Sequence, residues 1–186
     1  AASKTLPAPT QVTGNTCRVA WSPNSRLLCF YYTPGPAVIW DVEAWREVRA
    51  LPKSAYLCVA WLLDGKRLTA SSTAPDAVTL WQLQTGQTLW KMSNVREIGS
   101  LSVAKSGKLL AGAGADSVDV WHLDSGRHMK AFPSHSAMEH WGSNPVALSQ
   151  DGKQMATVHV ERKNILLRLW ETDSGSIDRD IPLENF

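Results

Sequence analysis

Ser102 and Lys105 are the first pair of residues in this chain whose spacing could do chemistry. They fit a Ser-x-x-Lys arrangement, in which the lysine activates the serine as a nucleophile. The further sequence elements of that enzyme class are absent from the 186 residues. The same residues also fit a strand that runs into a hairpin turn, and we interpret them in this structural way.

A second candidate is Gly112-Ala113-Gly114-Ala115, which begins like a phosphate-binding loop. It lacks the third glycine, the Gly-Lys pair and the following helix that such a loop needs to hold a phosphate. We therefore interpret these small residues as a tight connection between two strands.

The histidines offer the third candidate, because His135, Glu139 and His140 lie within one long connection. A metal site usually needs three or four convergent ligands with supporting hydrogen bonds, and this segment provides no clear set. The sequence also lacks Gly-x-Ser-x-Gly, His-Glu-x-x-His and paired Cys-His signatures. We predict no catalytic residues, no metal and no cofactor, and we predict that the protein is not an enzyme.

The elements that would position such residues come from one pattern, which the chain repeats four times. Each copy begins with an apolar run, continues through a turn and a second run, and reaches a tryptophan in a third run. The tryptophans are Trp40, Trp81, Trp121 and Trp170, at steps of 41, 40 and 49 residues. A period of about 40 to 50 residues indicates one supersecondary unit that is repeated.

Each repeat predicts four antiparallel strands. Asp64-Gly65 and Asp151-Gly152 separate the first two runs of their repeats, and Asp-Gly supplies the positive φ that a tight hairpin needs. A second turn, such as Asp124-Ser125-Gly126, follows each tryptophan and leads into a fourth run. No segment has a helical period of 3.6, so the sequence predicts an all-β fold.

The tryptophans explain why these units should stack. A single four-stranded sheet cannot bury both of its faces, and burial of one indole stabilises by about 2 to 3 kcal/mol. Sheets arranged around an axis bury the faces of their neighbours, which is the propeller architecture.

This pattern resembles the WD-repeat β-propeller family over about residues 17–181. The resemblance depends on Trp40-Asp41, on the three equivalent tryptophans, on Ser22-Pro23 and on the Asp-Gly-Lys turns at 64–66 and 151–153. It implies four consecutive blades at approximately 17–52, 57–93, 99–133 and 144–182, as a segment of a larger ring of seven or eight blades. Further blades of the same polypeptide or a second chain would complete that ring, and self-closure of the four blades is the remaining alternative.

The repeats depart from the family in two ways. Gln82, His122 and Glu171 replace the aspartate after the tryptophan, and the Gly-His pair before each first strand is missing. The resemblance implies a partial hydrogen-bond network in the fourth repeat, formed by His135, Thr157 and Trp170. We therefore expect a divergent member that apolar packing stabilises more than polar networks do.

Composition excludes several classes of function. The formal net charge is +2, and basic residues are interspersed with acidic ones, which is not typical of a nucleic-acid-binding surface. No run of about 18 apolar residues is present, so we predict no membrane span. Three cysteines, an odd number, argue against a disulfide framework and favour a cytoplasmic protein.

Binding on a repeat scaffold takes place on its variable connections. The resemblance implies that the connections after the second and fourth strands emerge on one face. Bulky or charged residues that do not follow the repeat are the candidate contacts with a protein partner, since aromatic and arginine residues often anchor interfaces. These candidates are Tyr32, Tyr56, Arg96, Glu97, Glu139, His140, Trp141, Arg162 and Lys163.

The sequence therefore favours a non-catalytic scaffold for protein-protein interaction. One alternative is a propeller enzyme or sensor domain with a small-molecule site at the centre of the ring. Another is an architectural or regulatory segment of a larger multidomain protein. Convergence of carboxylates and histidines from different repeats at the ring centre would favour the enzyme.

Overall fold

The computed structural model describes residues 16–33, 37–52, 56–73, 78–92, 98–114, 116–133, 145–161 and 164–183. These residues form four sheets, here called blades 1 to 4. Blade 1 contains β1 (Thr16–Trp21), β2 (Leu27–Thr33), β3 (Ala37–Asp41) and β4 (Arg46–Ala50). Blade 2 contains β5 (Tyr56–Trp61), β6 (Arg67–Ser72), β7 (Val78–Gln82) and β8 (Gln87–Met92). Blade 3 contains β9 (Ser100–Val103), β10 (Leu109–Ala113), β11 (Ser117–His122) and β12 (His128–Pro133). Blade 4 contains β13 (Val146–Leu148), β14 (Gln154–Glu161), β15 (Asn164–Glu171) and β16 (Ile177–Leu183).

Every blade is an antiparallel meander whose strands follow one another in sequence order. The described residues contain no helix. The predicted all-β fold of four consecutive four-stranded antiparallel sheets is therefore confirmed.

The two ends of the blades differ. At one end, here called the turn end, tight turns join the first strand to the second and the third to the fourth. Asp64 stabilises one of these turns, because its carboxylate accepts hydrogen bonds from the backbone N–H groups of Lys66 at 2.8 Å and Arg67 at 3.0 Å. The opposite end, here called the loop end, is where the second and fourth strands of each blade finish, because an antiparallel meander reverses at every strand.

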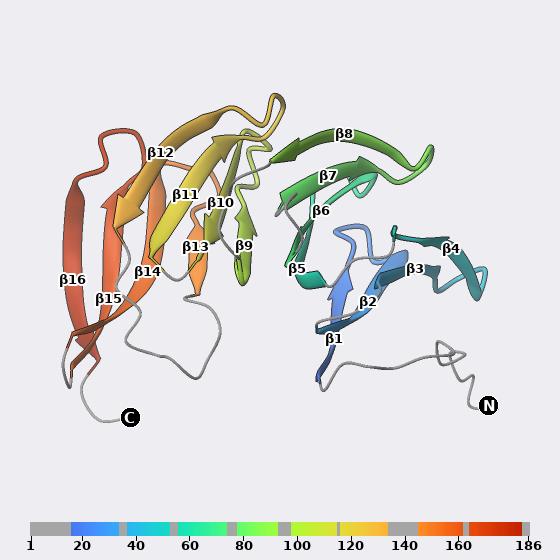
Figure 1. The fold of residues 1–186 in the computed structure, drawn as a ribbon, viewed down its shortest axis with the longest axis horizontal. Helices are drawn as coiled ribbons and strands as arrows, with labels where there is room; N and C mark the ends of the chain where they lie inside the picture. Colours follow the sequence, from blue (N-terminus) through green and yellow to red (C-terminus); the bar gives the residue numbers. More distant parts are fainter. Residues whose placement is uncertain are drawn as a thin grey trace.

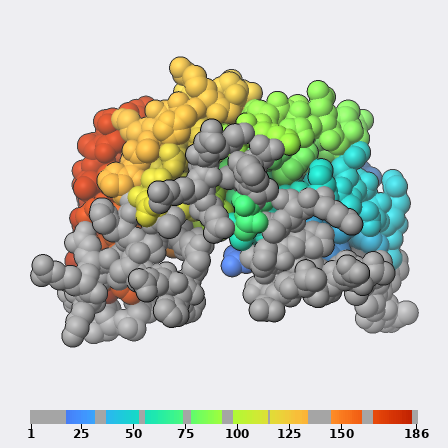
Figure 2. All heavy atoms as spheres, viewed as in Figure 1, coloured from blue at the N-terminus to red at the C-terminus, as the bar shows by residue number. Residues whose placement is uncertain are grey.

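The four blades form an arc, and each blade packs face to face on the next (Figure 1). The first strands β1, β5, β9 and β13 lie along the concave side, and the fourth strands lie along the convex side. In the space-filling view, the atoms of β8 and β12 follow those of β4 along this convex side (Figure 2). The arc thus presents a concave strand-lined surface, a convex surface and two ends.

The core tryptophans of blades 2, 3 and 4 each pack against the preceding blade. Trp81 lies in one cluster with Ile39 of blade 1, and Trp121 lies in a second cluster with Leu80 of blade 2. Trp170 lies in a third with Val120 of blade 3. The exposed fractions of the four indoles are 6% for Trp40, 5% for Trp81, 2% for Trp121 and 3% for Trp170. The predicted aromatic wedges therefore form the contacts between blades.

Candidate interaction surface

The concave side of the arc is built by the four first strands. Neighbouring first strands contact each other along this side. The indole N–H of Trp61 on β5 donates to the carbonyl oxygen of Ala20 on β1 at 2.9 Å. The N–H of Leu148 on β13 donates to the hydroxyl of Ser102 on β9 at 2.9 Å. These hydrogen bonds join the inner strands of blades 1 and 2 and those of blades 3 and 4.

The inner strands carry little acid-base chemistry. Their described sequences contain no aspartate, glutamate or histidine. Cys58 lies on β5, and burial raises the pKa of its thiol, so it stays protonated and is a poor nucleophile. Ser102, the residue of the Ser-x-x-Lys motif, accepts a backbone hydrogen bond from the next blade and so has a structural role. Within the described part of the chain, no cluster of three histidine, cysteine, aspartate or glutamate residues could hold a metal.

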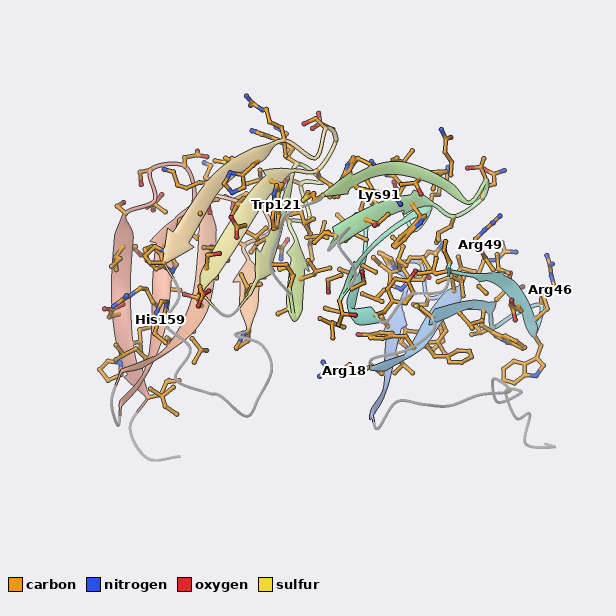
Figure 3. All side chains as sticks on the ribbon, in the orientation of Figure 1. Arg18, Arg46, Arg49, Lys91, Trp121 and His159 are labelled. Atoms are coloured by element: carbon orange, nitrogen blue, oxygen red, sulfur yellow. The ribbon has the colours of Figure 1, made fainter. Side chains whose placement is uncertain are left out.

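Arg18 is an exposed cation on the same side. It lies on β1 at the concave side of the arc (Figure 3), and its register partner on β2 is Tyr31. Burial raises the pKa of Tyr31 to about 12, although the Arg18 charge opposes that rise. The tyrosine is therefore neutral at physiological pH, and Arg18 presents a positive charge beside it.

Most residues predicted to contact a partner lie outside the described part of the chain. These are Arg96, Glu97, Glu139, His140, Trp141, Arg162 and Lys163. Tyr32 lies on β2, but the position of its side chain is likewise outside the description. The strands that flank these residues reach the loop end of the arc. Because the residues themselves are outside the description, their contact with a partner stays a prediction.

Tyr56 lies in the core instead of the exposed position predicted for it. Its side chain is 2% exposed, and its ring packs edge-on against Trp81 with 6.0 Å between ring centroids. Its hydroxyl donates to the carbonyl oxygen of Pro52 at 2.7 Å, and burial raises its pKa. The residue joins blade 1 to blade 2 because it begins β5 on the face that packs against blade 1.

A buried polar network occupies blade 4. The indole N–H of Trp170 donates to the hydroxyl of Thr157 at 2.8 Å, and that hydroxyl lies 2.9 Å from Nε2 of His159. The predicted pair of Thr157 and Trp170 is present, while His135 lies outside the described residues. His159 was missed by the sequence analysis, although its signal was there: it follows Thr157 by two residues, and residues two apart share one face of a strand. Figure 3 shows His159 on blade 4.

A groove of about 560 Å³ opens between blades 1 and 2 at their turn end. Its charged lining residues are Arg26, Arg46, Arg49, Lys66 and Asp41. Arg26 pairs with Asp41 at 3.2 Å, and Arg49 donates to the carbonyl oxygen of Leu83 at 2.9 Å. Arg46 and Lys66 are exposed. The sequence did not reveal this groove, because its two walls come from different repeats and meet only when the blades stack.

The comparison with curated proteins agrees with the repeat pattern. An uncharacterized WD repeat-containing protein of Synechocystis, sll1491, is 27% identical over 150 residues. That match covers 78% of this chain and 41% of the relative. The four repeats of this chain are therefore similar to those of a WD repeat-containing protein, and they depart from the usual pattern of that family. No family model matches these divergent repeats.

Solved structures show the same fold for these repeats. Hydrazine synthase of Kuenenia stuttgartiensis superposes with a TM-score of 0.74 and 15% identity, covering 89% of this chain and 48% of the other. U3-55K superposes with a TM-score of 0.70 and 16% identity, covering 90% of this chain and 54% of the other. The chain thus spans about half the length of the proteins that it resembles. At these identities the likeness establishes the propeller fold and leaves the activity to be argued from the residues.

In the residues that the structure describes, no helix has the length and apolar character that crossing a bilayer requires.

Proposed function

We propose that this chain is a non-catalytic scaffold that binds a protein partner through its loop end. The observation that supports this best is the make-up of the inner strands. Their side chains hold neighbouring blades together, and among the described residues they bring no carboxylate or histidine to the concave side. A rigid frame suits binding, because preorganised loops lose little entropy when a partner arrives.

The candidate contacts remain those of the loop end. Trp141, with Glu139 and His140, belongs to the longest connection of the chain, between β12 and β13. Arg96 and Glu97 lie between β8 and β9, and Arg162 and Lys163 lie between β14 and β15. A protein partner that contacts several blades at once would use these residues together. The proposal includes no binding of nucleic acid or of a membrane. Free thiols at Cys29 and Cys58 are in keeping with a cytoplasmic scaffold.

A second candidate function is supported by one comparison. Hydrazine synthase is an enzyme by name and shares the propeller fold with this chain. A small-molecule site at the centre of the arc would then use residues from several blades. Arg18 is the charged side chain of the described inner strands that could contact an anionic ligand there. An architectural role within a longer protein is the third candidate.

Replacement of Trp141 tests the scaffold proposal. We expect Trp141→Ala to reduce capture of a partner from extract about tenfold, the effect of losing one central aromatic anchor. The melting temperature should stay within about 2 °C of the wild type, since an exposed anchor contributes little to folding. The measurement is quantitative affinity capture with mass spectrometry, together with differential scanning calorimetry.

Lys66→Ala, at the turn end, is the matched control and should leave capture unchanged. Equal capture by the wild type and Trp141→Ala would count against the loop end as the binding surface. A fall of more than about 5 °C in the melting temperature would show that the Trp141 ring belongs to the core.

A further inference from the structure

One position of the fourth strand carries a hydrogen-bond donor in all four blades. It is the residue of the fourth strand whose register partner, on the third strand, comes immediately before the core tryptophan in the sequence. In chain order these residues are Arg49, Trp90, Lys130 and Arg179. Their backbones occupy equivalent places, so their side chains can be compared directly.

In the first three blades, this donor reaches a turn of the next blade. Arg49 donates to the carbonyl oxygens of Leu83 at 2.9 Å and Gln84 at 3.3 Å. Trp90 donates through its indole N–H to the carbonyl oxygen of Leu123 at 2.8 Å. Lys130 donates to the carbonyl oxygens of Asp173 at 2.8 Å and Ser174 at 2.6 Å. Three different side chains thus make one kind of contact, to the turn between the third and fourth strands of the following blade.

A glycine in each receiving turn makes room for the donor. The glycines are Gly86, Gly126 and Gly175, each five residues after the core tryptophan of its blade. A Cβ on Gly86 would overlap the Arg49 guanidinium, and one on Gly126 would lie 3.1 Å from the Trp90 ring. A Cβ on Gly175 would lie 2.9 Å from the Lys130 side chain. The contact therefore needs both a donor on one blade and a glycine turn on the next.

Arg179 is the fourth member of this series, and it is exposed. Within the described residues no hydrogen bond or ion pair involves its side chain. The apolar residues beside it are also incompletely covered. Leu167 and Leu169 are half-buried, whereas the equivalent residues of blades 1 to 3 are 1% exposed or less. Those equivalents are Ala37, Ile39, Val78, Leu80, Val118 and Val120.

We propose that this face of blade 4, formed by Leu167, Leu169, Arg179 and Ile181, packs against a further WD-type blade that follows β16 in the polypeptide. Blades 2, 3 and 4 each follow their predecessor in this way and cover the same positions. The relative and the two solved structures are each about twice as long as the part that matches this chain. Arg179 then donates to the carbonyl oxygens of a glycine-containing turn, and the two leucines pack beneath a tryptophan of that blade.

The first blade of a second copy does not fit this role. Its turn between β3 and β4 has Trp45 at the place where the other blades have glycine. Trp45 has a φ of 52° and lies edge-on to Trp40, with 6.2 Å between ring centroids. In the other three turns the glycine leaves room for a donor side chain from the preceding blade, whereas in this turn Trp45 carries an indole at that position. A turn of this kind cannot accept Arg179 as Gly86 accepts Arg49.

Variants of the chain as it stands test the first step. We expect Arg49→Ala and Lys130→Ala to lower the melting temperature by about 2 to 4 °C each, the effect of losing about one hydrogen bond in a chain of this size. Arg179→Ala should change it by less than about 1 °C. If Arg179→Ala destabilises the chain as much as Lys130→Ala does, Arg179 serves its own blade and the proposal is wrong.

An extended chain tests the second step. A copy of residues 51–92 joined after Asp180 places a second Gly86 turn beyond blade 4, in the register by which blade 2 follows blade 1. In this background, Arg179→Ala should now lower the melting temperature by about 2 to 4 °C, as Arg49→Ala does. With Gly86→Trp in the appended copy, Arg179→Ala should no longer lower the melting temperature. An Arg179→Ala effect that is absent, or that does not depend on the copied glycine, overturns the proposal.

Light scattering of the unextended chain tests the remaining alternative, in which a second copy of the chain covers this face of blade 4. A monomer over the micromolar range is expected. A dimer that Arg179→Ala dissociates would show that a second copy covers this face, and would overturn the assignment to a following blade. This measurement and the first set of variants do not depend on folding of the extended chain.

Discussion

At the scale of single residues, the indole N–H groups of Trp40 and Trp170 show what one hydroxyl changes. Both rings are buried at equivalent places, but Trp170 donates to Thr157, while the N–H of Trp40 finds no hydrogen-bond partner among the residues that the structure describes. Thr157 lies two residues after Met155, the register partner of Trp170. Phe30 lies at the corresponding place in blade 1, two residues after Leu28, the register partner of Trp40. Blade 1 therefore depends on apolar packing where blade 4 adds a polar network.

Removal of the Thr157 hydroxyl should expose this difference. We expect Thr157→Val, which keeps the shape, to lower the free energy of unfolding by about 1 to 3 kcal/mol, because the buried donor of Trp170 loses its acceptor. Thr157→Ser keeps the hydroxyl and should lose less, through one missing methyl group. Urea unfolding followed by tryptophan fluorescence measures both variants. Equal losses would mean that the hydroxyl contributes nothing beyond its packing.

At the scale of elements, the turn between third and fourth strands has a second role as the receptor of the preceding blade. Its glycine has positive φ in blades 2, 3 and 4, as the hairpin requires. The same glycine lacks the Cβ that would meet the donor side chain. One residue type thus satisfies a local backbone requirement and a contact between blades.

Two turn glycines separate these requirements. Gly107 and Gly126 have φ values of 71° and 68°, but only the Cβ of Gly126 would meet a neighbour, the Trp90 ring at 3.1 Å. Alanine at either site should cost about 1 to 2 kcal/mol for the left-handed backbone. Gly126→Ala should lose about 1 kcal/mol more, because the indole must shift from its hydrogen bond with Leu123. Equal losses in denaturant unfolding would show that the ring adapts without cost.

At the scale of the whole molecule, carboxylates distributed over the blades link stability to pH. Hydrogen bonds from the N–H of Ala44, with help from Arg26, lower the pKa of Asp41. The N–H of Lys153 lowers the pKa of Asp151, and the Arg168 side chain lowers that of Asp180. Groups whose pKa is lowered by folding stabilise the folded state above the unfolded pKa of about 3.9, and this contribution is lost as the pH falls toward the folded pKa.

The chain should therefore keep a nearly constant urea midpoint between about pH 5 and pH 7, and lose stability as the pH falls below about 4. Asp41→Asn should lower the midpoint at neutral pH and make the decline in acid shallower, since one linked proton is removed. Urea titrations at several pH values measure both effects. An acid decline as steep in Asp41→Asn as in the wild type would exclude Asp41 as a contributor.

How far the sequence could predict this molecule depends on the range of the interaction. The strands, turns and core tryptophans followed from the four repeats, because alternation and turn chemistry act over a few residues. The position of Tyr56 did not follow, since its burial depends on packing against Trp81 and a neighbouring blade. The family resemblance predicted His135 as the imidazole beside Thr157. In the structure that imidazole belongs to His159, which lies on the same face of β14 as Thr157. The loop-end residues, Trp141 among them, remain predictions.

The sequence by itself determined the repeated four-stranded unit and the place of each tryptophan in the third strand of its repeat, because those depend on period and on neighbours along the chain. Only the tertiary structure decided which side chains join one blade to the next. Arg49, Trp90 and Lys130 have different chemistry and meet carbonyl oxygens 33 to 44 residues away. Their common role appears only when the strand register aligns them, since stacking of the blades brings donor and turn together.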